Sequence, residues 1–301
     1  MRIMAELNGI IPVYKEQGWT SFDVVAKLRG ILHMKKLGHG GTLDPMAEGV
    51  LPVFVGKATK ACDIIPDRRK EYEAGFVLGI MTDTQDTTGK VLSENAGAVS
   101  AETLKAAAQR FVGEIMQIPP MYSAVKVGGK KLYELAREGK TVEREPRPIF
   151  VESIDITEYD EKTRSGKMYV KCHKGTYIRT IINDIGDAVG TGAAMTSLVR
   201  TYSGGCKAED CYTIEQIAEI CDGGKAEDII IPADRAFEDY ERIDLSQRIT
   251  GLYRNGVKLR PSQVGKSVPD DKIYRVYGSD GEFIGTGHFC GEEFRSMKNL
   301  R

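Results

Sequence analysis

The 301-residue sequence has no apolar run approaching the roughly 20 residues that a helix needs to cross a bilayer. No small-residue cleavage site follows the short apolar stretch near the N-terminus, so a secretory signal is not expected. The six cysteines form no C-x-x-C pair, and no histidines stand at metal-ligand spacing from them. These absences argue against a membrane protein, a disulfide framework and a metal site. They predict a cytoplasmic protein with reduced, buried thiols.

A large net charge is also missing. The formal charge of −1 at pH 7 excludes a protein that coats nucleic acid by bulk charge, but it leaves room for a local basic surface. No acidic residue lies between Val24 and Leu43, a stretch that holds Lys, Arg and His side chains. A second basic cluster at 126–140 is diluted by Glu134 and Glu138. Each cluster is either a solvated helix face or part of an RNA-binding surface.

The motifs for nucleotide cofactors are incomplete. Gly56-Lys57 follows Gly49 at the wrong spacing for a phosphate-binding loop, and Ala58 stands where a hydroxyl residue is required. The stretch 190–195 lacks the third glycine of a dinucleotide fingerprint and follows a predicted helix instead of a strand. No G-x-S-x-G motif is present. We therefore expect no nucleotide cofactor and no hydrolase triad.

Hydrophobic periodicity indicates a mixture of helices and strands. The predicted strands cover about 9–15, 50–55, 72–78, 149–156 and 168–172, and the predicted helices cover about 21–32, 100–111, 132–137, 178–185 and 214–220. The segment 117–148 is rich in proline and glycine around its short helix, and a connection of that length is usually functional or mobile. After Pro232 the pattern changes to two strands around a Ser-Asp-Gly turn, which indicates a small β-rich module.

The Leu43-Asp44-Pro45 stretch has an unusual setting. An aspartate that precedes proline is disfavoured in a helix, so the carboxylate of Asp44 is expected in a turn, directly before the buried strand at 50–55. Such an aspartate can simply form an Asx-turn or cap a helix. It can also be a catalytic carboxylate that a rigid strand holds in place.

The stretch around Asp44 closely resembles the catalytic signature of the TruB family of tRNA pseudouridine-55 synthases, of the bacterial type. Six further stretches match the family in the same order along the chain, so the resemblance spans about Ile11 to Gly204. The matching stretches are GHGGTLDPMAEGVLPV (38–53), GWTSFDVV (18–25), KEYEAGFVLG (70–79), TDTQDTTG (82–89), IPPMYSAVKVGGKKLYELAREG (118–139), KGTYIRT (174–180) and LVRTYSG (198–204).

The resemblance implies that the protein isomerises a uridine in the T-loop of tRNA. The bond between uracil N1 and ribose C1′ breaks, the base rotates, and C5 bonds to C1′, without a cofactor. Asp44 is then the catalytic residue, Arg179 pairs with its carboxylate, and Tyr72 stacks on the everted base and accepts a proton late in the reaction. Asp44 can attack the base, attack the sugar, or remove a ribose proton, and the sequence leaves these three routes open.

The resemblance also assigns four substrate-binding residues. His39 fills the space that the flipped nucleotide leaves, Tyr177 and Leu198 line the base pocket, and Lys15 supports the site or contacts phosphate. Each of the four could equally be a packing residue.

The fold that the resemblance implies is α+β. A central mixed or antiparallel sheet is expected in a pseudouridine synthase domain at 1–238, with a thumb insertion at about 118–148. A PUA-like RNA-binding module is expected at 239–301. The expected partner is the T stem-loop of tRNA, with no membrane and no metal, and the protein is expected to be a monomer.

Two other functions remain open. The protein could bind or fold RNA without catalysis, or it could be a nucleoside N-glycosidase that releases the base. The presence of Asp44, Tyr72 and Arg179 favours the synthase over a purely binding protein, and the fate of the uracil separates the synthase from the glycosidase.

Overall fold

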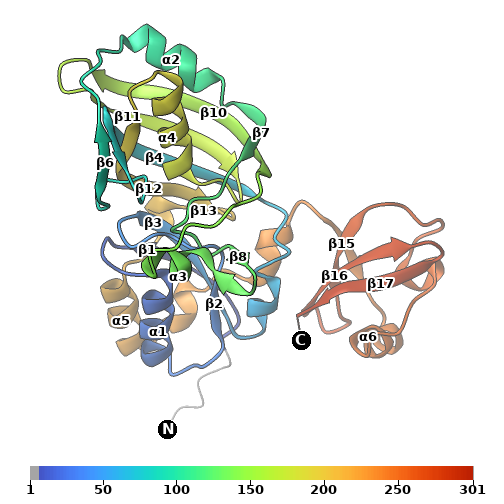
Figure 1. Cartoon of the computed structure of the whole chain (residues 1–301). Helices are drawn as coiled ribbons and strands as arrows, with labels where there is room; N and C mark the ends of the chain where they lie inside the picture. Colours follow the sequence, from blue (N-terminus) through green and yellow to red (C-terminus); the bar gives the residue numbers. More distant parts are fainter. Residues whose placement is uncertain (1–6, 301) are drawn as a thin grey trace. The chain divides into compact units, whose positions relative to one another are not determined.

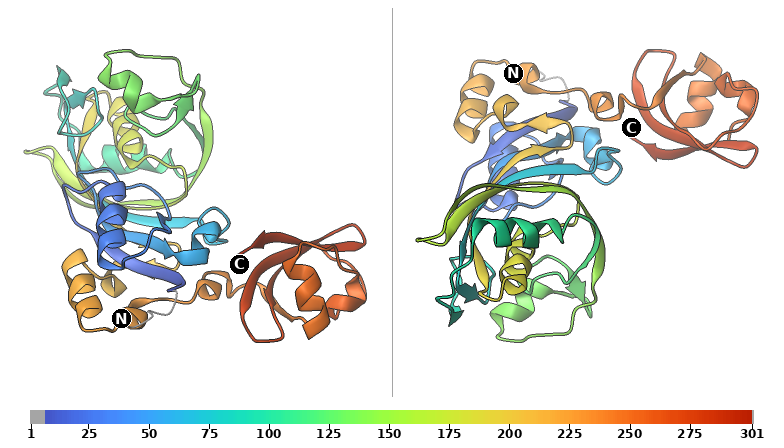
Figure 2. Two further views of the ribbon diagram at one scale, coloured as in Figure 1. Left: turned by 90° about the horizontal axis from the view of Figure 1, so that it is seen from below. Right: turned by 90° about the horizontal axis from the view of Figure 1, so that it is seen from above.

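The computed structural model describes residues 7–300. Two compact units divide the chain (Figures 1 and 2): the first contains Met1–Pro45, Val50–Asp67 and Gly204–Arg301, and the second contains Met46–Gly49 and Arg68–Ser203. The prediction that a secretory signal is absent rests partly on residues 1–6. These residues lie outside the described part of the chain. Within 7–300, no helix is long and apolar enough to span a membrane.

An antiparallel sheet with the strand order β12-β4-β11-β10-β7 forms the centre of the second unit (Figure 1). Two short hairpins accompany it, β5 with β6 and β8 with β9. The strands are β4 (Arg69–Leu78), β5 (Ile80–Thr82), β6 (Val91–Glu94), β7 (Gly113–Gln117), β8 (Lys126–Val127), β9 (Lys130–Lys131), β10 (Arg147–Asp160), β11 (Ser165–His173) and β12 (Ala193–Ser203).

Three helices belong to this unit: α2 (Ala101–Gln109), α3 (Leu132–Arg137) and α4 (Ile178–Ala188). Helix α2 packs on β10 and α4 packs on β12. The helical spacing of four isoleucines in α4 predicts one apolar stripe, and all four are buried: Ile178, Ile181, Ile182 and Ile185. All three predicted helices of this region are confirmed, and α3 has the predicted bounds.

The first unit packs two helices against a small group of strands. The strands are β1 (Gly9–Lys15), β2 (Leu37–His39), β3 (Glu48–Val55) and β13 (Cys206–Lys207), and the helices are α1 (Ser21–Ile31) and α5 (Ile214–Asp222). Short 3-10 turns connect them: η1 (Gly56–Ala61), η2 (Ala208–Asp210), η3 (Ala226–Ile229) and η4 (Ala233–Phe237). Thr20 and Thr213 cap the two helices in capping boxes; the Thr213–Gln216 spacing predicts the second box, whereas the first helix offers either Thr20 or Ser21 as its cap. Aliphatic side chains of β1, β3, α1 and α5 share one buried core.

Strand β3 makes the large sheet mixed. Its first two residues, Glu48 and Gly49, belong to the second unit and pair in parallel with β12, and its remaining residues run through the first unit. Hydrogen-bonded neighbours follow the order β1-β3-β12-β4-β11-β10-β7. Every residue of β3 after Glu48 is buried, as predicted for an apolar strand that is covered on both faces. The predicted α+β fold with a central mixed sheet is confirmed.

A separate four-stranded sheet lies near the C-terminus. Its strand order is β14-β15-β16-β17, with helix α6 (Gln247–Arg254) and the turn η5 (Pro261–Val264) beside it. Its core combines aliphatic side chains with four aromatic rings that contact one another, those of Tyr253, Tyr274, Phe289 and Phe294. The two predicted strands are confirmed as β15 and β16, and β14, β17 and α6 are additional. The strands are β14 (Glu241–Asp244), β15 (Ile273–Tyr277), β16 (Phe283–Cys290) and β17 (Glu293–Asn299).

All six cysteines are free. The prediction of buried thiols is confirmed for Cys172 and Cys206, and burial raises the pKa of each of these two thiols to about 11. It is wrong for Cys290, which is exposed at the end of β16. A thiol with such a raised pKa stays protonated at neutral pH, so Cys172 and Cys206 act as small apolar groups.

Candidate active site

Asp44 lies in an irregular loop between β2 and β3 and is half-buried. Both neighbours of Asp44 are held by residues from the segment that leads into α1. The backbone N–H of Leu43 donates to Ser21 Oγ (2.8 Å), and the same hydroxyl donates to Leu43 O (3.2 Å). On the other side, Pro45 O accepts a hydrogen bond from the Gly18 N–H (2.8 Å). The backbone of Asp44 is therefore fixed from both ends within the first unit.

Lys15, at the end of β1, has no exposed surface. Its ammonium donates to Trp19 O (2.7 Å) and Glu16 O (3.0 Å), and it lies 3.5 Å from Pro45 O. A buried ammonium needs several acceptors, because an unpaired charge in the interior is costly. These contacts join the strand end, the turn before α1 and the loop that carries Asp44, so the geometry favours support of the loop over contact with phosphate.

His39 ends β2 and is half-buried. It lies opposite Val53 of β3, and the N–H of the following residue, Gly40, donates to Pro52 O (2.8 Å). The backbone of His39 is thus held by the sheet, at the start of the loop that leads to Asp44.

In the second unit, the sheet places Tyr72 and Leu198 on one face. Tyr72 of β4 lies opposite Arg200 of β12, and Ala74 lies opposite Leu198. Directly opposed residues of antiparallel strands point to the same face, and so do residues two apart on one strand. Tyr72 and Leu198 are both buried, with exposed fractions of 6% and 7%.

The same face carries two cations that the sequence analysis missed. Arg200 is completely buried opposite Tyr72, and Lys70 stands two residues before Tyr72. Burial, together with the nearby charge of Arg200, lowers the pKa of Lys70 to about 8. The alternation of the predicted strand could have placed Lys70 beside Tyr72. No sequence signal pairs Arg200 with that strand.

Tyr177 and Arg179 stand at the start of α4. Tyr177 is the N-cap residue, half-buried, and its backbone is held by the side chain of Gln117 at the end of β7. Arg179 is 4% exposed and donates to Thr84 O (2.7 Å) and Tyr122 O (2.9 Å). Its guanidinium is therefore oriented by main-chain oxygens of two different loops.

Asp86 is a carboxylate that lies beside Arg179 within this unit. Its Oδ2 is 3.8 Å from Arg179 Nη1, and its Oδ1 accepts hydrogen bonds from the hydroxyls of Thr84 (2.8 Å) and Thr88 (2.5 Å). The sequence analysis placed Asp86 in a family motif and gave it no role. The geometry assigns it to holding the 82–89 turn against Arg179.

The predicted site residues thus fall into two groups. Lys15, His39 and Asp44 belong to the first unit, where Lys15 is tied directly to the Asp44 loop. The other four belong to the second unit, where Tyr72 shares a sheet face with Leu198, and Tyr177 shares a helix start with Arg179.

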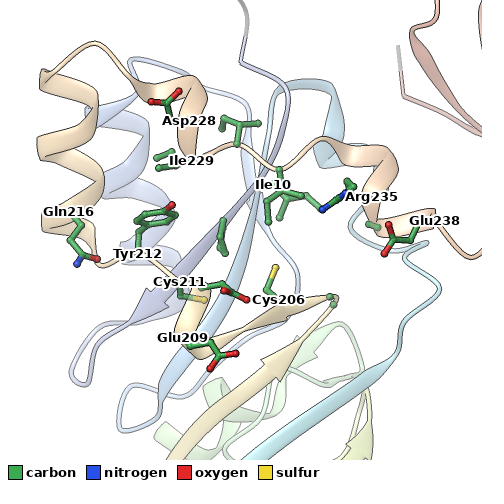
Figure 3. A pocket seen from close by; sticks show the side chains of 17 residues that line it. Ile10, Cys206, Glu209, Cys211, Tyr212, Gln216, Asp228, Ile229, Arg235 and Glu238 are labelled. Carbon is green, nitrogen blue, oxygen red and sulfur yellow. The ribbon is translucent and has the colours of Figure 1, made fainter.

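A cavity of about 700 Å³ in the first unit contains none of the predicted site residues (Figure 3). Its lining includes Ile10, Cys206 and Tyr212, with acidic side chains around them (Glu209, Asp210, Asp228 and Glu238) and one arginine, Arg235. This excess of negative charge disfavours a polyanion such as RNA.

Comparison with known proteins now adds to this geometry. Residues 29–178 match the family model described as TruB family pseudouridylate synthase (N terminal domain). Residues 179–238 match the model of the tRNA pseudouridylate synthase B C-terminal domain. The tRNA pseudouridine synthase B of Clostridium tetani is 44% identical over 295 residues, which cover 98% of this chain and all of that protein. The chain belongs to the TruB family of pseudouridine synthases.

Further relatives agree with this family. Proteins named tRNA pseudouridine synthase B from Clostridium perfringens (44% identity, 98% of this chain and 99% of that one) and Lactobacillus delbrueckii (46% identity, 84% of this chain and 87% of that one) are similar. The fold is similar to the crystal structure of a Cbf5-Nop10-Gar1 complex, with a TM-score of 0.75, 27% identity and coverage of 97% of this chain and 85% of that chain. The protein is therefore an enzyme with the pseudouridine synthase fold.

Proposed function

We propose that this enzyme isomerises a uridine in the T-loop of tRNA to pseudouridine and that Asp44 is the catalytic carboxylate. One observation carries the assignment of Asp44: both of its neighbours are anchored by hydrogen bonds from Gly18 and Ser21, which fixes the Asp44 backbone at one place. Fixed placement of a reacting group lowers the barrier, because no orientation has to be frozen during the reaction.

The reaction balances without an oxidant, a reductant or a cofactor. The N1–C1′ bond breaks, the C5–C1′ bond forms, the proton leaves C5, and N1 gains a proton. Asp44 starts this sequence by attack on the base, by attack on the sugar, or by removal of a ribose proton, and the family resemblance allows all three.

The other site residues have supporting roles in this proposal. Arg179 pairs with the carboxylate of Asp44, and Tyr72 stacks on the everted uracil and accepts the proton from C5. Tyr177 and Leu198 line the base pocket, and His39 fills the space that the base leaves. Low exposure of Tyr72 and Leu198 on one sheet face supports a water-excluding pocket wall.

The RNA-binding parts of the proposal are the thumb, residues 118–148, and the C-terminal module, residues 239–301. The thumb contains the β8–β9 hairpin with exposed Lys126 and Lys130 and the half-buried Lys131, which suits phosphate contacts that weaken with salt. The C-terminal module has its own aromatic core, which supports a separate PUA-like domain. We place the enzyme in the cytoplasm, where free thiols persist, and propose that it works as a monomer.

The test uses unmodified tRNA with the wild-type protein, Asp44→Asn and a control, Asp160→Asn. Asp160 is an exposed carboxylate at the end of β10. Asp160→Asn therefore removes the same charge as Asp44→Asn without altering the loop that carries Asp44. Chemical mapping should show pseudouridine at one T-loop uridine with the wild type and with the control. Asp44→Asn should bind the RNA and form no product.

Each alternative gives a different result. Equal product from wild type and Asp44→Asn would remove Asp44 from the mechanism. Tight binding without product in the wild type would indicate an RNA-binding protein. Release of free uracil would indicate a glycosidase.

A further inference from the structure

We infer that Gln117 is a positioning residue for the isomerisation, because its side chain sets the backbone of Tyr177 at the start of α4. This inference rests on the proposed role of Tyr177 in the base pocket. It concerns only residues of the second unit.

Two hydrogen bonds join Gln117 to Tyr177, which lies 60 residues later in the chain. Gln117 Nε2 donates to Tyr177 O (3.0 Å), and the Tyr177 N–H donates to Gln117 Oε1 (2.9 Å). Gln117 is only 2% exposed, so water has little access to replace either bond. One buried amide therefore satisfies both main-chain groups of one residue.

The helix start needs this support because no side chain caps it. Tyr177 is the N-cap residue of α4 and makes no side-chain cap hydrogen bond. Its carbonyl oxygen also accepts the first bond of the helix, from the Ile181 N–H (3.1 Å). The Gln117 amide bonds to the main chain of the N-cap residue itself, so it fixes the residue from which the helix begins.

Gln117 also stands where the thumb leaves the sheet. It is the last residue of β7 and pairs with Arg147, the first residue of β10, so the segment between them is the thumb. A second contact joins the same two regions, because Arg179 Nη2 donates to Tyr122 O within the thumb. The base of the thumb is therefore bonded to α4 at two residues of its first turn, Tyr177 and Arg179.

A carboxamide can make both bonds to Tyr177, and an ionised carboxylate cannot. The main chain of Tyr177 offers one donor and one acceptor, and an amide presents the matching acceptor and donor. An ionised glutamate has two acceptors, so one of its oxygens would face the carbonyl of Tyr177. A protonated glutamate has a donor again and restores the pair. This difference makes the role of Gln117 testable by pH.

The experiment compares Gln117→Leu and Gln117→Glu with a matched control, Gln109→Leu. Gln109, at the end of α2, also donates its amide to a main-chain oxygen, Ile154 O at 2.9 Å, but this oxygen belongs to β10 and not to α4. For each full-length variant, the single-turnover rate with unmodified tRNA, the RNA dissociation constant and the thermal midpoint are measured.

Gln117→Leu should lower the single-turnover rate by roughly 10- to 100-fold, because a shift of about 1 Å in a positioning group has effects of that size. RNA affinity should change much less, and Gln109→Leu should keep the wild-type rate at a similar thermal midpoint. The rate of Gln117→Glu relative to wild type should rise as the pH falls from about 9 to about 5, because burial raises the pKa of the introduced carboxyl and its protonated form restores the pair.

A wild-type rate in Gln117→Leu would overturn the inference, as would a Gln117→Glu rate with the same pH profile as wild type. If Gln117→Leu does not fold, the pH profile of Gln117→Glu tests the inference on its own. A wild-type protein that makes no pseudouridine would overturn the proposed function itself. If the wild-type protein makes pseudouridine and Gln117→Leu makes it at the same rate, only the positioning role of Gln117 is overturned.

Discussion

Substitution of Ser21 by alanine tests whether the anchoring of the Asp44 loop matters for catalysis. The hydroxyl accepts from the Leu43 N–H (2.8 Å) and donates to Leu43 O (3.2 Å), and Ser21 is 2% exposed. A buried polar group left without a partner costs about 1–3 kcal/mol. We therefore expect Ser21→Ala to lower the free energy of unfolding by about 2 kcal/mol, most of it from the unpaired Leu43 N–H.

The effect on the reaction should be larger than this loss of stability suggests. Leu43 directly precedes Asp44, so a freed Leu43 backbone lets the carboxylate move. A displacement of about 1 Å can cost up to 100-fold in rate, so a fall of roughly tenfold or more is expected in the single-turnover rate. RNA affinity should stay close to wild type, because Ser21 is buried and does not reach the solvent.

Ser100→Ala is the matched control. Its hydroxyl accepts from the Thr103 N–H (3.2 Å) as the cap of α2, and loss of such a cap costs about 1 kcal/mol. Urea unfolding and single-turnover kinetics are measured on both variants. If Ser21→Ala loses stability as expected but keeps the wild-type rate, as Ser100→Ala should, then the anchoring does not serve catalysis and the reasoning fails.

Three further predictions follow from the second unit. The pKa of Lys70 is lowered from 10.5 to about 8, so the unfolded chain binds this proton more tightly than the folded protein does. The contribution of Lys70 to the free energy of unfolding should therefore rise between pH 8 and 10.5. Urea unfolding of Lys70→Met should not show this rise. Gly49→Ala should unfold at a much lower temperature than Gly190→Ala. Both glycines have a positive φ, but a Cβ at position 49 would lie 2.3 Å from a main-chain oxygen, and a Cβ at position 190 would meet open space. Deletion of 128–138 should raise the RNA dissociation constant more than it slows chemistry on bound RNA, and unchanged affinity would contradict the thumb assignment.

The sequence predicts local structure well where the signals are local. Thr20 and Thr213 begin α1 and α5 because their hydroxyls cap the helix N–H groups, and both appear in the structure as capping boxes. The apolar run of β3 and the isoleucine stripe of α4 are buried as expected.

Strand β12 is not evident from the sequence because its pairing is irregular. Two shifts of register against β4, between Met195 and Ser197 and between Arg200 and Tyr202, interrupt the alternation of inward and outward side chains. In the C-terminal sheet, β14 and β17 carry charged residues that obscure the same pattern. Strands are read from a single sequence by regular alternation or by a continuous apolar run, and these strands show neither pattern.

The family resemblance suggested the candidate site residues, Lys15 among them, but not the contacts that hold them. Family motifs contain Asp44 and Arg179, but the contacts that hold them join distant parts of the chain. Lys15 reaches Pro45 across 30 residues, and Arg179 reaches Thr84 across 95. No spacing rule connects positions so far apart, so these contacts require the structure.

Three side chains that fix the geometry of the proposed site share a property that determines which positions can be substituted. Lys15, Arg179 and Gln117 each bind main-chain oxygens: three for Lys15, two for Arg179 and one for Gln117. Every amino acid carries that oxygen, so exchange of a residue that only accepts, such as Glu16 or Tyr122, leaves the bond available. We therefore expect unequal tolerance to mutation: replacement of Lys15, Arg179 or Gln117 should be harmful, whereas Glu16 and Tyr122 should tolerate changes of side chain.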